Sequence, residues 1–324
     1  MRKEFEKIIL QATNAKEVSN TITIQSLWSG YGEIARVNIC GGDFPSIIIK
    51  NIRLPQQAKH PRGWNTNISH QRKIKSYEVE MNFYQQWSKL CNNKCRIPKC
   101  YANSTMDEES LIVLEDLDVS GYPIRKSFLT KEETKTCLKW LANFHATFIN
   151  VIPEGLWEVG SYWHLSTRSD EFEAMEDSKL KHCAHQIDEI LNRCEYQTFV
   201  HGDAKVANFC FSADGKEVAA VDFQYVGGGC GIKDVAYLLG SCLTPLECKE
   251  WEEELLDFYF EVLETTLDEV GKNLEFKSLE EEWRKMYVFA WADFSRFLLG
   301  WMPTHQKLNA YSLQQVEKTL LLIN

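Results

Sequence analysis

The sequence predicts an α+β protein with two unequal lobes, a small N-terminal β-rich lobe and a larger, mainly helical C-terminal lobe. Two stretches near the N-terminus, 21–39 and 45–52, are rich in β-branched residues and broken by glycines, as strands often are. Beyond residue 118, apolar residues recur at helical spacing in most segments. A short β-hairpin is expected inside this helical part, within residues 199–224. At 324 residues the chain is long enough for two lobes with real cores.

The first lobe is assigned to residues 1–117 and is expected to contain an antiparallel sheet and one helix. The helix is predicted over residues 73–90, because apolar side chains recur there at helical spacing: Ile74, Tyr77, Met81 and Tyr84. The polar, turn-rich segment 58–71 before this helix predicts a loop. A short buried strand over 110–118 ends in polar residues, which places a hinge between the lobes at residues 115–118.

The second lobe is assigned to residues 118–324. Amphipathic helices are predicted over 131–148 and 169–194, and the second of these begins with a serine followed by acidic residues. Nearly everything beyond Ile232 is predicted to be helical. The hairpin in this lobe has an Asp-Gly turn at residues 214–215, a pair that is typical of tight hairpins.

The composition is ordinary for a soluble globular protein, with 44% apolar and 25% charged residues. The net charge of −10 leaves no broad basic field for nucleic acid or an anionic membrane surface. The N-terminus lacks the apolar segment of a secretory signal, and no apolar run approaches the roughly 20 residues of a membrane span. We therefore expect neither a nucleic-acid partner nor a membrane anchor, and the sequence predicts no oligomeric state.

The eleven cysteines suggest reduced thiols and a cytoplasmic protein. Most of them, such as Cys137 and Cys242, stand alone inside apolar segments, where a thiol behaves as a small apolar side chain. Cys91, Cys95 and Cys100 form a cluster that could suggest zinc. Their spacing is not C-x2-C and no fourth ligand follows at finger-like spacing, so ordinary thiols are the preferred interpretation.

Three polar residues lie beside apolar, strand-like sequence in FVHGDAKVANFCFSADGKEVAAVDFQ, residues 199–224. Asp203 and Asn208 lie five residues apart in one loop, and the hairpin can return Asp222 to the side of Asn208. Charged groups avoid apolar surroundings unless they have a partner. An amide and a carboxylate, completed by water and phosphate, commonly hold Mg²⁺ in nucleotide enzymes. The remaining acid, Asp203, can accept a proton from a hydroxyl.

The same stretch resembles the catalytic region of the protein-kinase-like superfamily. HGDAKVAN, residues 201–208, matches H-x-D-x-x-x-x-N, and DFQ, residues 222–224, matches the metal-binding D-F-x that follows it. The glycine after the histidine and the final glutamine resemble the small-molecule branch: aminoglycoside phosphotransferases, choline kinases and, most of all, the ecdysteroid kinase-like group. LIVLEDLD, LANFHA and GIKDVAYLL resemble that group as well, so the resemblance spans roughly residues 20–245.

This resemblance implies a protein-kinase-like bilobal fold that uses ATP and Mg²⁺. It implies that Asp203 is the catalytic base and that Asn208 and Asp222 hold the metal. Lys205 stands where the ecdysteroid kinase-like group often has an aromatic residue and protein kinases have a lysine. It is expected to contact the γ-phosphate, with a solvent-exposed position as the alternative.

The resemblance also implies a nucleotide site in the first lobe. A phosphate-covering loop is expected between the first two strands, where Gly30 and Gly32 would let backbone N–H groups approach the phosphates. Lys50 stands at the position that pairs with the α- and β-phosphates. A glutamate on the following helix should hold Lys50, and Glu80 is preferred over Glu78 because it lies on the apolar face of that helix.

Adenine is expected against the backbone of the hinge, between Glu115 and Leu117. Three further residues are interpreted as scaffold. His201 is expected to hydrogen-bond backbone groups of the catalytic loop, and His145 to lie in the core or behind the site. Asp234 lies at a helix start that it can cap, while the resemblance implies that it steadies the catalytic loop.

The acceptor is expected to be a hydroxyl of a small molecule. Only eleven residues, FQYVGGGCGIK, separate Asp222 from Asp234, which is short for the segment that cradles a peptide in protein kinases. The candidate pocket lies on the aromatic helix 281–301, where Asp293 and Trp291 could face a cationic substrate. Plain core packing, with Asp293 paired to Arg296 or Arg284, is the preferred alternative.

A second candidate wall of the acceptor pocket is GSYWHLSTR, with Trp163 and Arg168. An amino alcohol, a sterol, a sugar and an aminoglycoside remain open as acceptors. The function predicted from the sequence is therefore an ATP-dependent small-molecule kinase with an alcohol acceptor. A catalytically inactive nucleotide-binding scaffold is the alternative from another class, and a protein kinase is disfavoured by the short segment.

Overall fold

The fold was taken from a computed structural model, which describes residues 2–27, 30–53 and 67–323. Most of the loop predicted over 58–71, and Trp28 and Ser29 of the predicted phosphate loop, lie outside the described residues. None of the helices within the described ranges is both long and apolar enough to cross a membrane.

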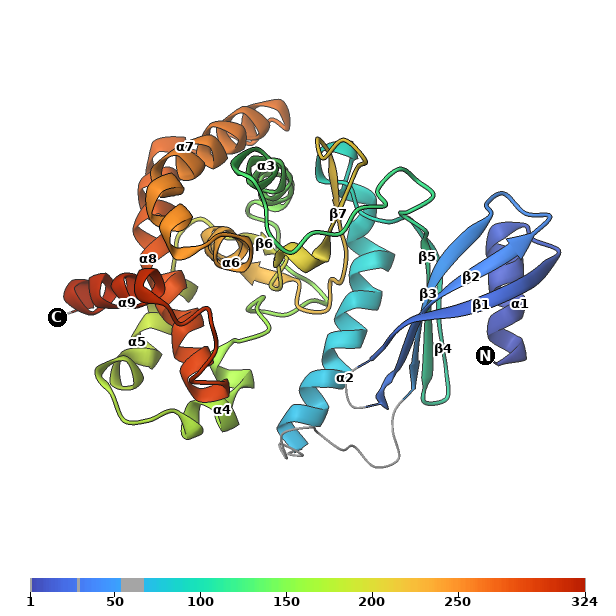
Figure 1. The fold of residues 1–324 in the computed structure, drawn as a ribbon, viewed down its shortest axis with the longest axis horizontal. Coiled ribbons are helices and arrows are strands. Elements are labelled where there is room, and N and C mark those ends of the chain that lie inside the picture. The colour runs from blue at the N-terminus through green and yellow to red at the C-terminus, as the bar shows by residue number, and fades with distance from the viewer. Residues whose placement is uncertain (1, 28–29, 54–66, 324) are drawn as a thin grey trace.

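The N-terminal part is an antiparallel five-stranded sheet with the strand order β1-β2-β3-β5-β4. The strands are β1 (Glu17–Ser26), β2 (Gly32–Cys40), β3 (Ser46–Arg53), β4 (Cys100–Met106) and β5 (Glu109–Glu115). Helix α1 (Lys3–Thr13), which the sequence analysis did not predict, covers one face of the sheet. Helix α2 (Asn67–Asn82) lies on the other side, between the sheet and the helical part (Figure 1).

The C-terminal part is mainly helical, as predicted. Its helices are α3 (Lys131–Phe148), α4 (Ser169–Ala174), α5 (Lys179–Asn192), α6 (Ile232–Cys242), α7 (Pro245–Glu269), α8 (Phe276–Trp301) and α9 (Ala310–Ile323). Two short antiparallel pairs lie among them: β6 (Thr198–Val200) with β9 (Gly227–Gly229), and β7 (Phe209–Phe211) with β8 (Val218–Ala220). The second pair is the predicted hairpin. Helix α3 begins with a capping box, in which Thr130 and Glu133 satisfy each other's backbone N–H groups.

Two apolar cores divide the molecule differently from the proposed boundary after residue 117. One core lies between α1 and the sheet and includes Phe5, Ile9 and Val37. The larger core runs from α2 into the helical part, and the Phe83 ring just after α2 stacks on Phe223 with ring centroids 4.2 Å apart. Helix α2 therefore packs with the helical part as well as with the sheet, and the boundary after residue 117 stays a proposal.

Ion pairs and a hydrogen bond connect residues 116–118, which follow β5, to the sheet. Arg36 of β2 donates from Nε to Asp116 at 2.6 Å and also pairs with Asp118. Ser46 of β3 donates to the same Asp116 carboxylate at 2.7 Å. These contacts fix the start of the proposed hinge relative to the strand that carries Lys50.

Candidate active site

The catalytic loop predicted at residues 201–208 connects β6 to the β7–β8 hairpin. Phe209 pairs with Ala220 in this hairpin, and the Val221 N–H donates to the Asn208 carbonyl at 3.0 Å. Asp222 is the next residue along the chain. The hairpin therefore returns Asp222 to the side of Asn208, as the sequence predicted.

Two buried residues hold the start of this loop in place. Asp234 accepts the backbone N–H groups of His201 and Gly202 at 2.5 and 3.0 Å. The Asp203 N–H donates to His201 Nδ1 at 3.3 Å, so Nε2 carries the ring proton and donates to the Val221 carbonyl at 3.0 Å. The expected backbone bonds of His201 are confirmed. The capping of α6 by Asp234 is wrong, because its carboxylate is used by the loop instead.

Asp203 is 6% exposed and its two carboxylate oxygens differ. Oδ2 accepts hydrogen bonds from Lys205 Nζ at 2.9 Å and from Asn208 Nδ2 at 3.1 Å. Oδ1 is buried and has no hydrogen-bond partner within the described part of the chain. A buried carboxylate oxygen without a donor is unfavourable. Burial and the nearby Asp203 carboxylate both raise the pKa of the Tyr237 hydroxyl, so this hydroxyl lies close to Asp203.

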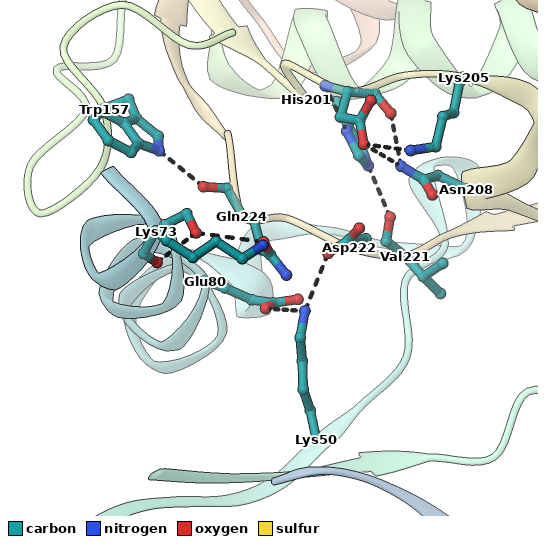
Figure 2. A network of polar contacts seen from close by, with 12 residues as sticks. Lys50, Lys73, Glu80, Trp157, His201, Lys205, Asn208, Val221, Asp222 and Gln224 are labelled. Carbon is teal, nitrogen blue, oxygen red and sulfur yellow. Dashed lines mark hydrogen bonds and ion pairs between the residues drawn. The ribbon is translucent and has the colours of Figure 1, made fainter. Parts of the chain in front are cut away.

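Lys50 links the sheet to both α2 and the metal-binding motif (Figure 2). Its Nζ lies 2.6 Å from Glu80 Oε2 and 3.1 Å from Asp222 Oδ1. Glu78, the rejected alternative, is exposed and lies 3.9 Å from Lys75 on its own helix. Burial alone would raise the pKa of Asp222, but the charges of Lys50 and Lys205 lower it to about 2. Asp222 is therefore an anion throughout the physiological pH range.

Asp222 and Asn208 provide oxygen ligands that suit Mg²⁺. Asn208 Nδ2 donates to the Asp203 carbonyl at 2.8 Å as well as to its carboxylate, so Asn208 Oδ1 is left as the acceptor. Asp222 has a φ of +70°, an uncommon backbone conformation for a residue other than glycine. Among the described residues no group of three histidine, cysteine, aspartate or glutamate side chains could hold a metal. A metal at Asn208 and Asp222 would therefore need phosphate and water oxygens as further ligands.

The two glycines of the predicted phosphate loop differ in what surrounds them in the structure. Gly32 has a φ of +121°, and a Cβ there would lie 1.9 Å from the Asn51 carbonyl oxygen. Only glycine therefore fits at position 32, because strand β3 passes so close to it. The sequence did not predict this packing requirement. Gly30 has a φ of +79° and no described atom within 4 Å of a Cβ built there. Gly30 is the better candidate for close approach of a phosphate.

The hinge offers backbone groups where adenine was predicted. The Leu117 carbonyl accepts hydrogen bonds from the N–H groups of Tyr122 and Ser120 at 2.8 and 3.2 Å. The Leu117 N–H has no partner among the residues that the structure describes. The Glu115 side chain pairs with Arg96 at 2.6 Å, and its N–H donates to the Lys99 carbonyl at 2.8 Å.

Gln224, the residue that replaces the glycine of D-F-G, joins α2 to the metal-binding motif. Its Oε1 accepts hydrogen bonds from Lys73 Nζ at 3.2 Å and Ser76 Oγ at 3.4 Å. Its carbonyl accepts from Trp157 Nε1 at 2.8 Å (Figure 2). Lys73 lies on the helix that carries Glu80, and Gln224 lies two residues after Asp222. The contact between Lys73 and Gln224 therefore connects the segments that carry the two acidic partners of Lys50. The unusual DFQ motif was the available signal, but its partner on α2 could not be identified from the sequence.

We expect a double-mutant cycle on Gln224→Ala and Lys73→Met to show a favourable coupling of about 0.5–3 kcal/mol in the free energy of unfolding. The reason is that Lys73 is partly buried and Gln224 Oε1 is its side-chain hydrogen-bond acceptor. Urea unfolding of the four proteins measures the coupling. The same cycle with Lys75→Met, an exposed lysine on α2, is the control. Equal couplings in the two cycles would show that the contact contributes nothing specific.

Three of the four candidate substrate residues are packed inside the helical part. Asp293 is 1% exposed, and its carboxylate oxygens accept from Arg296 Nη2 at 2.6 Å and Trp163 Nε1 at 2.9 Å. Trp163 and Trp291 are 1% and 2% exposed. The preferred alternative, an Asp293–Arg296 pair in the core, is therefore confirmed, and the geometry argues against the use of these three residues by a substrate.

Arg168, the fourth candidate substrate residue, lies near the catalytic loop. It donates to the Tyr162 carbonyl at 2.6 Å and to Glu171 at 2.9 Å, and the Tyr162 N–H donates to the Gly202 carbonyl at 3.0 Å. Tyr162 also neighbours two other tyrosines, with ring centroids 5.9 Å from Tyr225 and 5.8 Å from Tyr237. The sequence analysis missed these tyrosines, although each lies within a segment that it had already singled out.

Comparisons with known proteins agree with this geometry. No curated protein matches the sequence. The fold is similar to a microcompartment-associated aminopropanol kinase (TM-score 0.52, 15% identity, 96% of this chain and 93% of that one). It is also similar to an amicoumacin kinase solved with AMP-PNP and Ca²⁺ (TM-score 0.52, 12% identity, 100% of this chain and 96% of that one). An ethanolamine kinase from Plasmodium vivax gives a similar match (TM-score 0.51, 12% identity, 95% of this chain and 84% of that one). These likenesses show the bilobal kinase-like fold.

The family itself is shown by the sequence. The model of the ecdysteroid kinase-like family matches residues 58–155 and 157–272, which together make up more than half of the chain. The matched region contains α2 with Glu80, the catalytic loop and the DFQ motif. This protein therefore belongs to the ecdysteroid kinase-like family.

Proposed function

We propose that this protein is an ATP-dependent phosphotransferase that transfers the γ-phosphate of ATP to a hydroxyl group of a small molecule. The observation that carries the proposal is the buried Asp203 Oδ1, which lacks a hydrogen-bond partner among the described residues. It lies on the same loop as Asn208, which the hairpin places beside Asp222. The residue that we propose as the base and the two that we propose as metal ligands are therefore neighbours, which supports the proposal.

The nucleotide is assigned to the side of the site formed by the sheet. Lys50, held between Glu80 and Asp222, would bind the phosphates, and Gly30 would let the backbone approach them. The hinge N–H of Leu117 would meet the adenine. Bound Mg²⁺ would neutralise phosphate charge, with Asn208 Oδ1 and Asp222 as its protein ligands.

Asp203 would orient the acceptor hydroxyl through Oδ1 and take its proton as the phosphoryl group transfers. The Lys205 ammonium lies 2.9 Å from the other oxygen of Asp203, and it would contact the γ-phosphate. Burial lowers the pKa of Lys205, but the charge of Asp203 outweighs it and raises this pKa above its ordinary value. Lys205 therefore stays protonated and would stabilise the transferring phosphoryl group.

The packing after the DFQ motif supports a small-molecule acceptor. Residues 227–229 pair with β6, and the segment 157–160 covers their other side. A Cβ at Gly227 would lie 2.1 Å from the Trp157 carbonyl oxygen, so this close approach requires glycine. The segment is thus used internally and offers no platform for a peptide. The printed names of the structural neighbours, kinases of aminopropanol, ethanolamine and amicoumacin, also favour a small molecule.

The described cysteines support a reducing, cytoplasmic location, because all eleven are free thiols. The cysteines considered for zinc follow this pattern. Cys95 is buried, whereas Cys91 and Cys100 are partly buried.

We expect millimolar MgATP to raise the melting temperature of the protein. A ligand that binds only the folded state adds about 2.7 kcal/mol of stability at a concentration 100 times its Kd. Thermal denaturation with ATP, with MgCl₂, with both and with neither measures the effect. The shift should be largest with both and should fall when EDTA removes the metal. No shift with MgATP would rule out the proposed nucleotide site.

A further inference from the structure

The charges around Asp203 carry an inference about the acceptor, which rests on the proposed function. An acceptor with an amine would need a free acid near its reacting hydroxyl. Asp293, the acid that was considered for that purpose, is paired with Arg296 in the core. Glu171 is paired with Arg168. Asp234 is used by the backbone of the catalytic loop, and Asp203 and Asp222 are assigned to catalysis and metal, so none of these acids is left for an amine.

Lys307 is a cation near Asp203 without an acidic partner of its own. It lies in the segment between α8 and α9, with its Nζ 4.7 Å from the centroid of the Tyr237 ring and 5.5 Å from that of Phe294. None of the described carboxylates forms an ion pair with it. Asp203 is the strongest opposite charge that acts on it. Two aromatic rings thus hold an ammonium group on the side of Asp203 that faces α6 and α8.

The surroundings of Lys307 make its charge costly in the absence of a ligand. The pKa of Lys307 is lowered to about 8, mainly by burial and also by the charge of Lys205, although Asp203 and Cys242 act in the opposite direction. The other titratable groups that face this segment are the Tyr237 hydroxyl and His305, whose Nδ1 accepts the Lys307 N–H at 3.1 Å. An anion placed beside Lys307 would offset this cost.

Tyrosine side chains line the same region. The three rings of Tyr162, Tyr225 and Tyr237 form a continuous row, with neighbouring centroids less than 6 Å apart. Lys307 lies over the last ring of this row, and Tyr162 in the middle of the row donates its backbone N–H to the Gly202 carbonyl of the catalytic loop at 3.0 Å. The acceptor side of the loop is therefore aromatic, with an unpaired ammonium group at one end.

We propose that Lys307 binds the acceptor, and that the acceptor carries an anionic group, such as a carboxylate, sulfate or phosphate, attached to an apolar or aromatic body. The anion would pair with Lys307 while the body lies against the two partly exposed tyrosines of the row, Tyr162 and Tyr225, and the hydroxyl reaches Asp203. An amine at the same place would meet two ammonium groups, Lys205 and Lys307, and none of the acids named above would be free for it. This distinguishes the acceptor from those that the names of the structural neighbours indicate.

Three related acceptors test the proposal, because each has a benzylic primary alcohol on a benzene ring and they differ in charge; the neutral diol has two such alcohols, so its kcat/KM is compared per hydroxyl group. They are para-(hydroxymethyl)benzoate, para-benzenedimethanol and para-(hydroxymethyl)benzylamine. ADP release with MgATP gives kcat/KM for each. The wild-type protein should prefer the benzoate to the neutral diol by about tenfold or more, and the amine should be the poorest. The variant Lys307→Met should remove the preference for the benzoate, and Lys307→Glu should reverse the order of benzoate and amine.

The control is Lys318→Met, which removes an exposed lysine from α9 and should keep the wild-type order. A preference of the wild-type protein for the amine or the diol, or an unchanged benzoate-to-diol ratio in Lys307→Met, would overturn the proposal. If none of the three is turned over, the melting temperature with MgADP and each compound provides the readout. A benzoate shift that depends on Lys307 supports the proposal, and equal shifts for all three count against it. A missing MgATP shift would instead overturn the proposed function itself.

Discussion

Replacing Asp203 by asparagine is expected to lower phosphoryl transfer by roughly 10²–10⁴-fold, the usual contribution of a general base. The amide keeps the shape of the side chain but cannot accept the proton of the hydroxyl. Lys205 also loses the carboxylate that it contacts at 2.9 Å. ADP release in the presence of an acceptor measures the loss.

Nucleotide binding separates this effect from unfolding. The Asp203→Asn protein should keep most of the stabilisation by MgATP, because Lys50 and Asp222 are unchanged. Asp268→Asn, which alters an exposed acid on α7, should behave like the wild-type protein in both assays. Retained turnover in Asp203→Asn would show that another group is the base.

Asp222→Asn is expected to abolish the dependence of ATP binding on Mg²⁺. Asn208 would be the only protein ligand left to the metal, and Lys50 would keep Glu80 as its only acidic partner. Calorimetric titration with ATP, with and without MgCl₂, should show a large effect of Mg²⁺ on wild-type affinity. In Asp222→Asn the two titrations should give similar affinities.

The pH dependence of stability and of metal binding provides a second check on Asp222. Because its pKa is lowered from 3.8 to about 2, Asp222 contributes stability that is present above pH 3.8 and is lost as the pH falls towards 2. Metal binding should therefore not weaken through Asp222 at any pH near neutrality. The control is Asp214→Asn, an exposed acid in the turn of the same hairpin. A strong Mg²⁺ effect that persists in Asp222→Asn would place the metal elsewhere.

Several parts of the candidate site could be predicted because they are local in the chain. Asp203 and Asn208 lie in one loop, and a short hairpin returns the chain to Asp222 within fourteen residues. Few conformations of such a short segment satisfy both the apolar strand pattern and the Asp-Gly turn. The helical face of Glu80 was predictable for the same reason, because a helix has a fixed period.

Other contacts depend on which elements pack together. Gln224 and Lys73 are 151 residues apart, and their contact requires α2 to lie against the metal-binding motif. For Asp293 the sequence left both a substrate contact and a core pair with arginine open, with the core pair preferred, and the contacts with Arg296 and Trp163 decide for the core. A sequence shows that an acid lies on an apolar face, but it does not show whether the partner is a protein cation or a ligand.

Local sequence patterns predicted the proposed base, the two proposed metal ligands, a lysine for the phosphates and a glutamate for that lysine, together with their spacing. Which distant groups meet depends on the fold. Lys50 and Asp222 are 172 residues apart, yet they lie 3.1 Å from each other. The physical reason is that charge pairing and burial act over a few ångströms in space. Contacts of this kind are decided by the packing of whole elements, which local sequence patterns do not contain.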